Sequence, residues 1–236
     1  SSDGIGGLGA GGGFAVRGNV TVAGNILMDA GTRGGNGSDG GGDAFGGNIT
    51  LTGDLTAQGG LEGFITAIGG NATASGTGGR GAGGRFELLT SNAEAAFVAG
   101  FVEIFADTTG GSGATGGDAT GATVRLLTVQ PGASIDLGAL DVRGNATGGN
   151  GDVAGLGQGG SILLANTGIM RFSQLNGGVA LEAVGIGGFG GSGQGGAGRG
   201  GTISVQNDAG GSFSIVTGDG LGMQADGRGG DTFDGR

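Results

Sequence analysis

The chain has 236 residues, of which 70 are glycine and one is proline, and it contains no Cys, His, Trp or Tyr. Twenty acidic residues outnumber ten cations, all of them arginines, for a net charge of −10. This composition excludes thiol and imidazole catalysis and the usual zinc site. It also argues against a nucleic-acid partner, which requires a basic surface and stacking aromatic rings. Collagen is excluded because there is no strict Gly-X-Y period.

Short strand-like segments recur along the chain at intervals of 34 to 41 residues. Such a constant spacing is typical of a repeat architecture. We therefore predict six repeat units within one domain covering residues 1–236. The units begin with FAVRG at Phe14, NITLTG at Asn48, RFELLT at Arg85, TVRLLT at Thr123, SILLAN at Ser161 and TISVQN at Thr202.

Each unit has three short alternating segments followed by a Gly-rich stretch. In the fourth unit these are TVRLLTV, ASIDLG and ALDVRG, and then NATGGNGDVAGLGQGG. Apolar residues alternate with polar or small ones, which predicts strands, and glycine every few residues disfavours helices.

Six such units fit an all-β parallel β-solenoid of about six coils, in which equivalent strands stack with like residues above like. A β-propeller is disfavoured because its blades have four strands and aromatic signatures, and a β-sandwich because it has no six-fold recurrence. The Gly-rich stretches follow the third strand of every coil, so we expect them to stack and to bond between coils as extended or polyproline-II-like segments. The alternative is that they form long turns on one edge.

Neither end of the chain has a capping segment. Residues 1–13 and 227–236 are interpreted as incomplete Gly-rich ends, and solenoids without caps expose strand edges that recruit further strands. The start SSDGIGGLGAGGG lacks the features of a signal peptide, and no apolar run reaches the roughly 20 residues of a membrane span. We expect either a slice of a longer repeat chain or a subunit that stacks head to tail on itself, with no membrane span.

Segments such as NITLTGDLTAQGG and NVTVAGNILMDAG resemble the β-helical repeats of filamentous haemagglutinin, autotransporter passengers and related bacterial surface or matrix adhesins. The resemblance covers all six units, although the Gly-rich stretch in each coil departs from those families. It implies a secreted or cell-surface, non-catalytic structural segment of a fibre or matrix. The alternative is an adhesin stalk or tip that binds a surface receptor or glycan.

One stretch suggests a metal site. GGNGSDGGGD at residues 34–43 matches the first six positions of a calcium-binding nonapeptide pattern, so Asp39 and Asp43 are candidate calcium ligands. Other units do not reproduce the pattern, and solvated turn aspartates are the alternative. No other cofactor is expected.

The remaining polar patterns have an ordinary structural explanation. Five N-x-[ST] sites are possible glycan acceptors, but this pattern also arises from Asn and Thr in strands. The strand carboxylates and arginines are expected on the outer face as solvated pairs, and no enzymatic activity is predicted. The N-x-[ST] sites are Asn19, Asn36, Asn48, Asn71 and Asn145.

Overall fold

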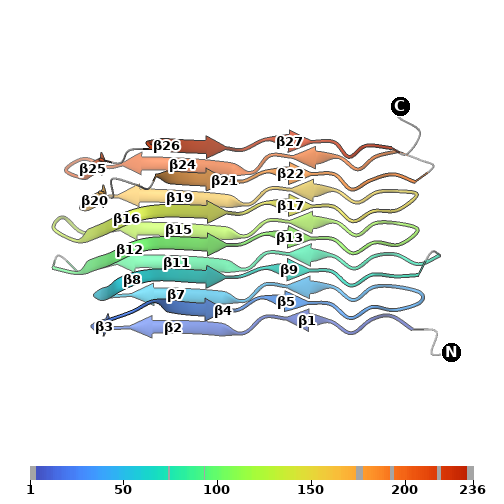
Figure 1. The fold of residues 1–236 in the computed structure, drawn as a ribbon, viewed down its shortest axis with the longest axis horizontal. Helices are drawn as coiled ribbons and strands as arrows, with labels where there is room; N and C mark the ends of the chain where they lie inside the picture. Colours follow the sequence, from blue (N-terminus) through green and yellow to red (C-terminus); the bar gives the residue numbers. More distant parts are fainter. Residues whose placement is uncertain are drawn as a thin grey trace.

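The computed structural model describes residues 4–73, 75–92, 94–173, 178–191, 194–216 and 219–232. These residues form a parallel β-solenoid of about six turns with no helix among them (Figure 1). The predicted fold class is therefore confirmed. Each coil is a flattened loop, and equivalent segments of successive coils lie directly above one another.

Two long sheets form one half of every coil. Long sheet 1 contains β2 (Gly13–Arg17), β7 (Asn48–Thr52), β11 (Arg85–Thr90), β15 (Thr123–Thr128), β19 (Ser161–Asn166) and β24 (Thr202–Asn207). Long sheet 2 contains β3 (Val20–Val22), β4 (Ile26–Asp29), β8 (Leu55–Phe64), β12 (Ala96–Phe105), β16 (Ser134–Arg143), β20 (Ile169–Phe172), β21 (Val179–Glu182), β25 (Ser212–Ile215) and β26 (Leu221–Gln224).

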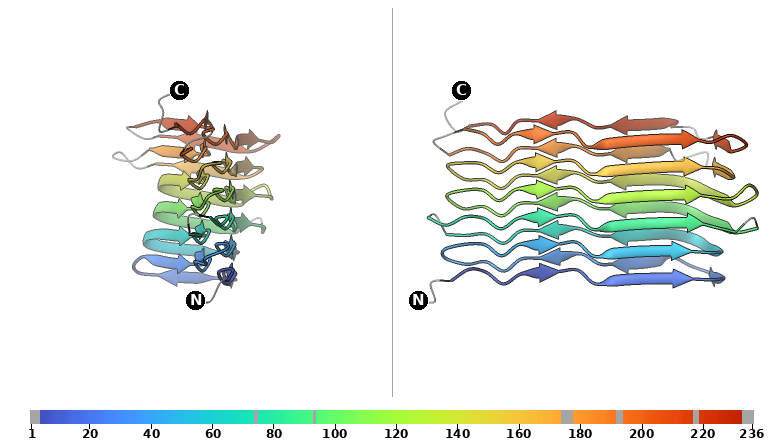
Figure 2. Two further views of the ribbon diagram at one scale, coloured as in Figure 1. Left: turned by 90° about the vertical axis from the view of Figure 1, so that its right-hand side faces the viewer. Right: turned by 180° about the vertical axis from the view of Figure 1, so that it is seen from behind.

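Two short sheets form the other half, which we call the glycine half (Figure 2). Short sheet 1 contains β1 (Gly9–Ala10), β6 (Ala44–Phe45), β10 (Gly81–Ala82), β14 (Ala119–Thr120), β18 (Gly157–Gln158) and β23 (Gly198–Arg199). Short sheet 2 contains β5 (Thr32–Arg33), β9 (Ala67–Ile68), β13 (Thr108–Thr109), β17 (Ala146–Thr147), β22 (Gly185–Ile186) and β27 (Gly227–Arg228). The chain leaves long sheet 2 through short sheet 2 and returns through short sheet 1 to long sheet 1.

The strands of long sheet 1 coincide with the six predicted unit starts. They pair in parallel and residue for residue; for example, Phe86 lies between Ile49 and Val124. The recurrence in the sequence therefore marks one position of the coil.

The second and third predicted strands differ from the structure in the middle coils. There they form single ten-residue strands, β8, β12 and β16. The register of β12 on β8 shifts between Ala99 and Phe101, opposite Ala57 and Gly60, so the extra residue is absorbed as a bulge. Because Gly59 and Gly100 lie at this junction, the backbone continues across it in an extended form.

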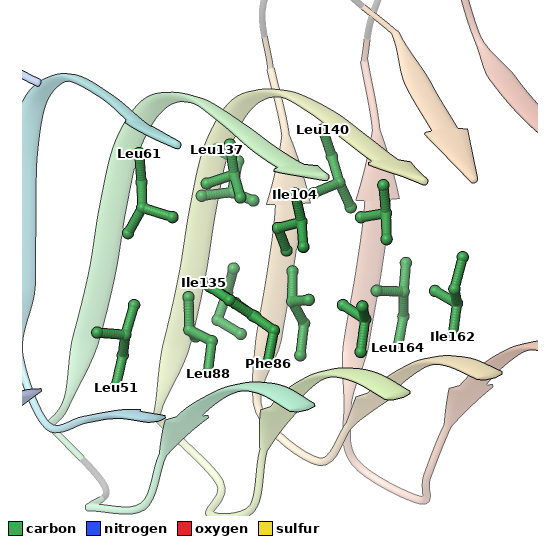
Figure 3. Packing of buried hydrophobic residues seen from close by; sticks show 14 of the residues in the cluster. Leu51, Leu61, Phe86, Leu88, Ile104, Ile135, Leu137, Leu140, Ile162 and Leu164 are labelled. Atoms are coloured by element: carbon green, nitrogen blue, oxygen red, sulfur yellow. The ribbon is translucent and has the colours of Figure 1, made fainter. Parts of the chain in front are cut away.

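Apolar columns fill the space between the two long sheets (Figure 3). Leu51, Phe86 and Leu88 of long sheet 1 face Ile104 and Leu137 of long sheet 2, and all five are buried. Like residues stack because parallel pairing repeats the same inward position every coil. Among the described residues, the large buried apolar side chains lie in this half of the molecule.

A column of polar side chains closes the turn end of long sheet 1, buried at Thr90, Thr128 and Asn166 and exposed at Asn207 in the last coil. Thr90, Thr128, Asn166 and Asn207 occupy equivalent positions in successive coils. The Thr128 hydroxyl donates to Asn166 Oδ1 (2.6 Å) and accepts from the Gly168 amide (2.9 Å). Asn166 Nδ2 donates in turn to Asn207 Oδ1 (2.8 Å). The hydrogen bonds of Thr128 and Asn166 offset the cost of burying these two polar side chains.

Replacing Thr128 by valine tests this column. Thr128→Val leaves Asn166 Oδ1 and the Gly168 amide without these partners in a buried site, so we expect a loss of about 2–3 kcal/mol in unfolding free energy. Thr90→Val is the matched control, since Thr90 is equally buried and, among the described residues, its hydroxyl makes a single long bond of 3.4 Å to the Leu127 carbonyl. Chemical denaturation followed by circular dichroism measures both variants. Equal losses would contradict the assignment.

In the glycine half, the backbone comes too close at many positions for a side chain to fit. A Cβ built on Gly110 would lie 1.9 Å from the Gly117 carbonyl oxygen of the facing layer, and one on Gly111 would lie 1.8 Å from that of Gly70, one coil earlier in the same layer. Real Cβ atoms do not approach oxygen so closely. Backbone contacts between layers and between coils, together with small buried side chains such as Ala44 and Ala119, therefore replace a core of large apolar side chains in this half.

Hydrogen bonds cross between these layers from one end of the described stack to the other. Each glycine amide in the series donates to the carbonyl of the preceding member at 2.7–3.0 Å, alternating between the outgoing and returning segments. We call this series the glycine zigzag. Its members in order are Gly7, Gly35, Gly42, Gly70, Gly79, Gly111, Gly117, Gly149, Gly155, Gly188, Gly196 and Gly230.

Other amides of the same segments bond along the stack, as the Gly34 amide does to the Ile68 carbonyl (2.9 Å). The expectation that Gly-rich stretches stack and bond between coils is confirmed. The bonds between the two layers were not anticipated from the sequence.

Substituting one glycine of the zigzag tests the steric requirement. In Gly111→Ala the new methyl group collides with a backbone oxygen that has no room to move, so we expect an overpacking cost of about 3 kcal/mol and a fall in Tm of roughly 6 °C or more. Gly144→Ala is the control, because a Cβ there meets its nearest atom at 3.7 Å and equivalent positions hold Ala106 and Ala183. Thermal melts that shift equally for both variants would contradict this account.

Candidate functional site

The two candidate calcium ligands lie in the first turn of the glycine half. The Asp43 carboxylate Oδ1 accepts the Arg80 backbone amide of the next coil at 2.7 Å. Asp39 is bonded to the next coil through its backbone, because its carbonyl accepts the Thr77 amide at 3.3 Å. Among the described residues, no group of three or more acidic side chains is placed to hold a metal ion. Calcium binding at Asp39 and Asp43 stays a prediction.

The bond made by Asp43 belongs to a general pattern that sequence reasoning missed. At several positions an Asn or Asp side-chain oxygen, in place of a backbone carbonyl, accepts the amide of the next coil. Asn145 Oδ1, for example, accepts the Val184 amide at 2.8 Å. The same bond is made by Asn36 to Asn71, Asn71 to Ser112, Asp107 to Asn145, Asn150 to Phe189 and Asp118 to Leu156. Three of the five N-x-[ST] asparagines therefore have a structural role.

Charged side chains of the long sheets lie on the outer face, as expected. Glu87 pairs with Arg85 in its own strand and with Arg125 in the next coil (3.7 Å). Arg143 and Asp141 pair within one strand at 2.8 Å. The Arg143 guanidinium also lies 5.5 Å from the centre of the Phe105 ring, which stacks on Phe64. These partly exposed pairs contribute little to stability individually.

Asp107 is the acidic group in this region whose titration is perturbed. Burial raises the pKa of its carboxyl, and the Asn145 amide and the Arg143 charge oppose that rise. A raised carboxyl pKa means that the folded state binds the proton more readily than the unfolded state does. The penalty for the charged form is therefore present at neutral pH and disappears as pH falls through the raised value.

Asp107→Asn removes this penalty and keeps the Oδ1 acceptor, as Asn145 does one coil later. We expect Tm to rise by about 1–3 °C at pH 7, with the difference from the original protein shrinking as the solution is acidified. Asp107→Ala is the control, since it also loses the acceptor and is expected to lower Tm. Melts across pH 4–7 measure both. A Tm for Asp107→Asn below that of the original protein at pH 7 would contradict the interpretation.

A surface hollow lies over the tips of the glycine half. It is an open groove of about 750 Å³ lined by Ser112, Asn150, Asp152, Phe189 and Asp231, together with neighbouring small residues. The Phe189 side chain is half exposed there. Such a volume is suitable for a small ligand.

The two end faces of the described stack expose groups that are covered in the middle coils. Phe14 in the first coil is 43 % exposed and Met223 in the last is 56 % exposed, whereas Phe86 of the third coil is fully buried. The strands β2 and β24 are the edges of long sheet 1, and β5 and β27 are those of short sheet 2. Edge strands present unpaired amides and carbonyls that can accept another strand.

Comparisons with protein-family models, curated proteins and solved structures find no match for this chain. Across the described residues, no helix is long and apolar enough to cross a membrane.

Proposed function

We propose that this chain is a non-catalytic structural subunit or segment of an extracellular bacterial fibre or matrix, built by axial stacking of solenoid coils. Its work is mechanical: each coil is bonded to its neighbours, and the stack transmits load along its axis. The observation that carries the proposal is the continuity of bonding from the first described coil to the last.

Three bonding systems run parallel to the axis and repeat once per coil. The apolar columns bury side chains such as Leu88 and Leu126 against one another. The backbone ladders of all four sheets join every coil to the next. The glycine zigzag crosses between layers along the same direction. A structure with bonding of this kind extends by adding coils, because every added coil gains the same contacts.

The outer surface is suited to a rod in water. The net charge of −10 repels like rods and keeps them dispersed. Glu87 pairs with Arg125 and Asp136 with Arg171 of the next coil, so some of these charges are matched along the stack.

Electron cryomicroscopy of the purified protein tests the proposal. We expect filaments of constant width, with a strong layer line near about 4.8 Å along the axis from the spacing of parallel strands. Discrete particles that stay monomeric at high concentration would contradict axial assembly.

The alternative is an adhesin stalk or tip whose loops bind a surface receptor or glycan. The groove at the tips of the glycine half favours it, since Phe189 offers an apolar ring beside the carboxylates of Asp152 and Asp231. Discrete particles that retain a ligand on a glycan array, with retention lost in Phe189→Ala, would support this alternative over the fibre.

A further inference from the structure

The outer faces of the two long sheets carry opposite charge. In each strand, alternate residues point away from the core, and the charged residues among them differ between the sheets. Long sheet 1 has three arginines and one glutamate, a net charge of +2, and long sheet 2 has six carboxylates and two arginines, a net charge of −4. On long sheet 1 they are Arg17, Arg85, Glu87 and Arg125. On long sheet 2 they are Asp29, Glu62, Glu103, Asp136, Asp141, Arg143, Arg171 and Glu182.

The outer face of long sheet 1 has a leucine column beside its charges. Leu89 and Leu127 pair in register on β11 and β15, and their side chains are partly exposed. Two residues earlier in the same strands lie Glu87 and Arg125, which form an ion pair of 3.7 Å. A partner of this face therefore meets an apolar column and a charged column side by side.

The outer face of long sheet 2 has phenylalanine rings on both sides of a carboxylate column. Glu62 and Glu103 pair in register on β8 and β12, and among the described residues neither has an ion-pair partner. Two residues later lie Phe64 and Phe105, whose rings stack with centroids 5.0 Å apart. On the other side of Glu103, the Phe101 ring lies over the backbone of β8. This face is therefore acidic and partly apolar.

The long sheets are also flat. Figure 1 shows that the strands of the first and last coils run in nearly the same direction, so little twist accumulates along the stack. Sheets of many strands normally twist, and flat ones are typically stabilised by stacking or by side-chain ladders. Two flat faces can stay in contact over several coils.

We propose that the outer face of long sheet 1 of one copy packs against the outer face of long sheet 2 of a second copy, so that rods join side by side. The two copies are related by a translation perpendicular to the stack axis. The contact involves β7, β11 and β15 of one copy and β8, β12 and β16 of the other. This inference goes beyond the proposed function, because it does not depend on how coils continue along the axis.

Packing inside each copy fixes which columns meet. Gly63 of β8 lies against the ring of Phe86 of β11. Because the two sheets run in opposite directions, Glu87 and Glu62 both lie on the turn side of this contact. A translated copy therefore sets the column of Glu87 and Arg125 opposite the carboxylate column. Glu87 is already paired with two arginines, so the excess positive charge of these arginines faces the carboxylates.

The apolar columns meet in the same arrangement. One column closer to the turn end, Leu89 and Leu127 come opposite Phe101. One column closer to the glycine half, Arg85 comes opposite Phe105. Burial of the apolar side chains drives association, and a guanidinium over an aromatic ring adds a cation–π attraction.

Contacts between like faces are disfavoured. Two faces of long sheet 2 would oppose carboxylates, and two faces of long sheet 1 would oppose arginines. The net charge of −10 repels rods in other orientations, so we expect this contact at high concentration. Because unlike faces meet by translation, the contact does not close, and it generates layers of rods rather than dimers.

X-ray diffraction from concentrated protein tests the contact with the original chain. Each rod contributes two long sheets, and facing sheets lie about 10 Å apart, so rods stacked through these faces repeat with a period of about 20 Å. We expect this equatorial reflection to strengthen with concentration. Filaments that stay single at every concentration would overturn the lateral contact and leave the proposed function intact. A lateral repeat from particles that form no filaments would support the contact and contradict the proposed function.

Two charge-reversed variants test which faces meet. Arg125→Glu alters the face of long sheet 1, and Glu103→Arg alters the face of long sheet 2. We expect each variant alone to lose lateral assembly by roughly tenfold or more, measured by sedimentation and electron microscopy. An equal mixture is expected to restore assembly, because the altered face of one variant attracts the altered face of the other while the unaltered faces still pair.

Arg80→Glu and Glu94→Arg are the matched controls, since they make the same charge changes outside both faces. The Arg80 side chain is 71 % exposed in the glycine half, and Glu94 is exposed in the turn between β11 and β12. Both controls are expected to assemble like the original protein, and thermal melts check that every variant is folded. Two folded variants whose mixture does not assemble would overturn the pairing of these faces, as would full assembly of either variant alone. If another protein or further chain covers these faces instead, the original protein forms no layers, which would also overturn the proposal.

Discussion

The close approach of two glycine layers is the constraint on which the rest of this structure depends. At the separation observed, the backbone carbonyl of one layer occupies the space that a Cβ of the other would fill. The same closeness lets amides bond across the layers, so the peptide groups of a segment with no hydrophobic core still find partners. Glycine is the residue that permits this arrangement, and its entropic cost is offset by the bonds it allows.

The two halves of the coil fix the register together. In the long sheets, a slip by one residue would turn the inward columns of Ile49 and Phe86 outward. In the glycine half, a slip would place residues such as Ile68 and Thr109 where only hydrogen fits. Residue sizes are also matched between the two long sheets. Gly63 of β8 lies against the ring of Phe86 of β11, where a Cβ would be 3.0 Å from the nearest ring atom. Large residues of one long sheet are thus matched by small ones of the other.

Much of the architecture could be predicted from the sequence, because alternating strand-like segments recur once per coil, beginning near Phe14, Asn48 and Arg85. What could not be predicted is how the glycines pair. Period-two alternation describes one strand and its side chains, whereas bonds across layers involve no side chain. The recurring doublets Gly69-Gly70 and Gly110-Gly111 are the feature of the sequence that corresponds to these contacts. The role of Asn71 and Asn145 was missed for another reason, since the N-x-[ST] pattern and the strand-start preference each explained those residues without a bond between coils.

The unequal division of the coil has a consequence for how the protein responds to temperature. The heat-capacity change on unfolding grows with the apolar surface exposed and is reduced by the polar surface exposed. Here the apolar columns occupy one half of each coil, and the other half exposes mainly peptide groups when it unfolds. The curve of stability against temperature should therefore be flatter than that of a globular domain of equal length. The cohesion between successive coils should therefore change little between cold and warm surroundings.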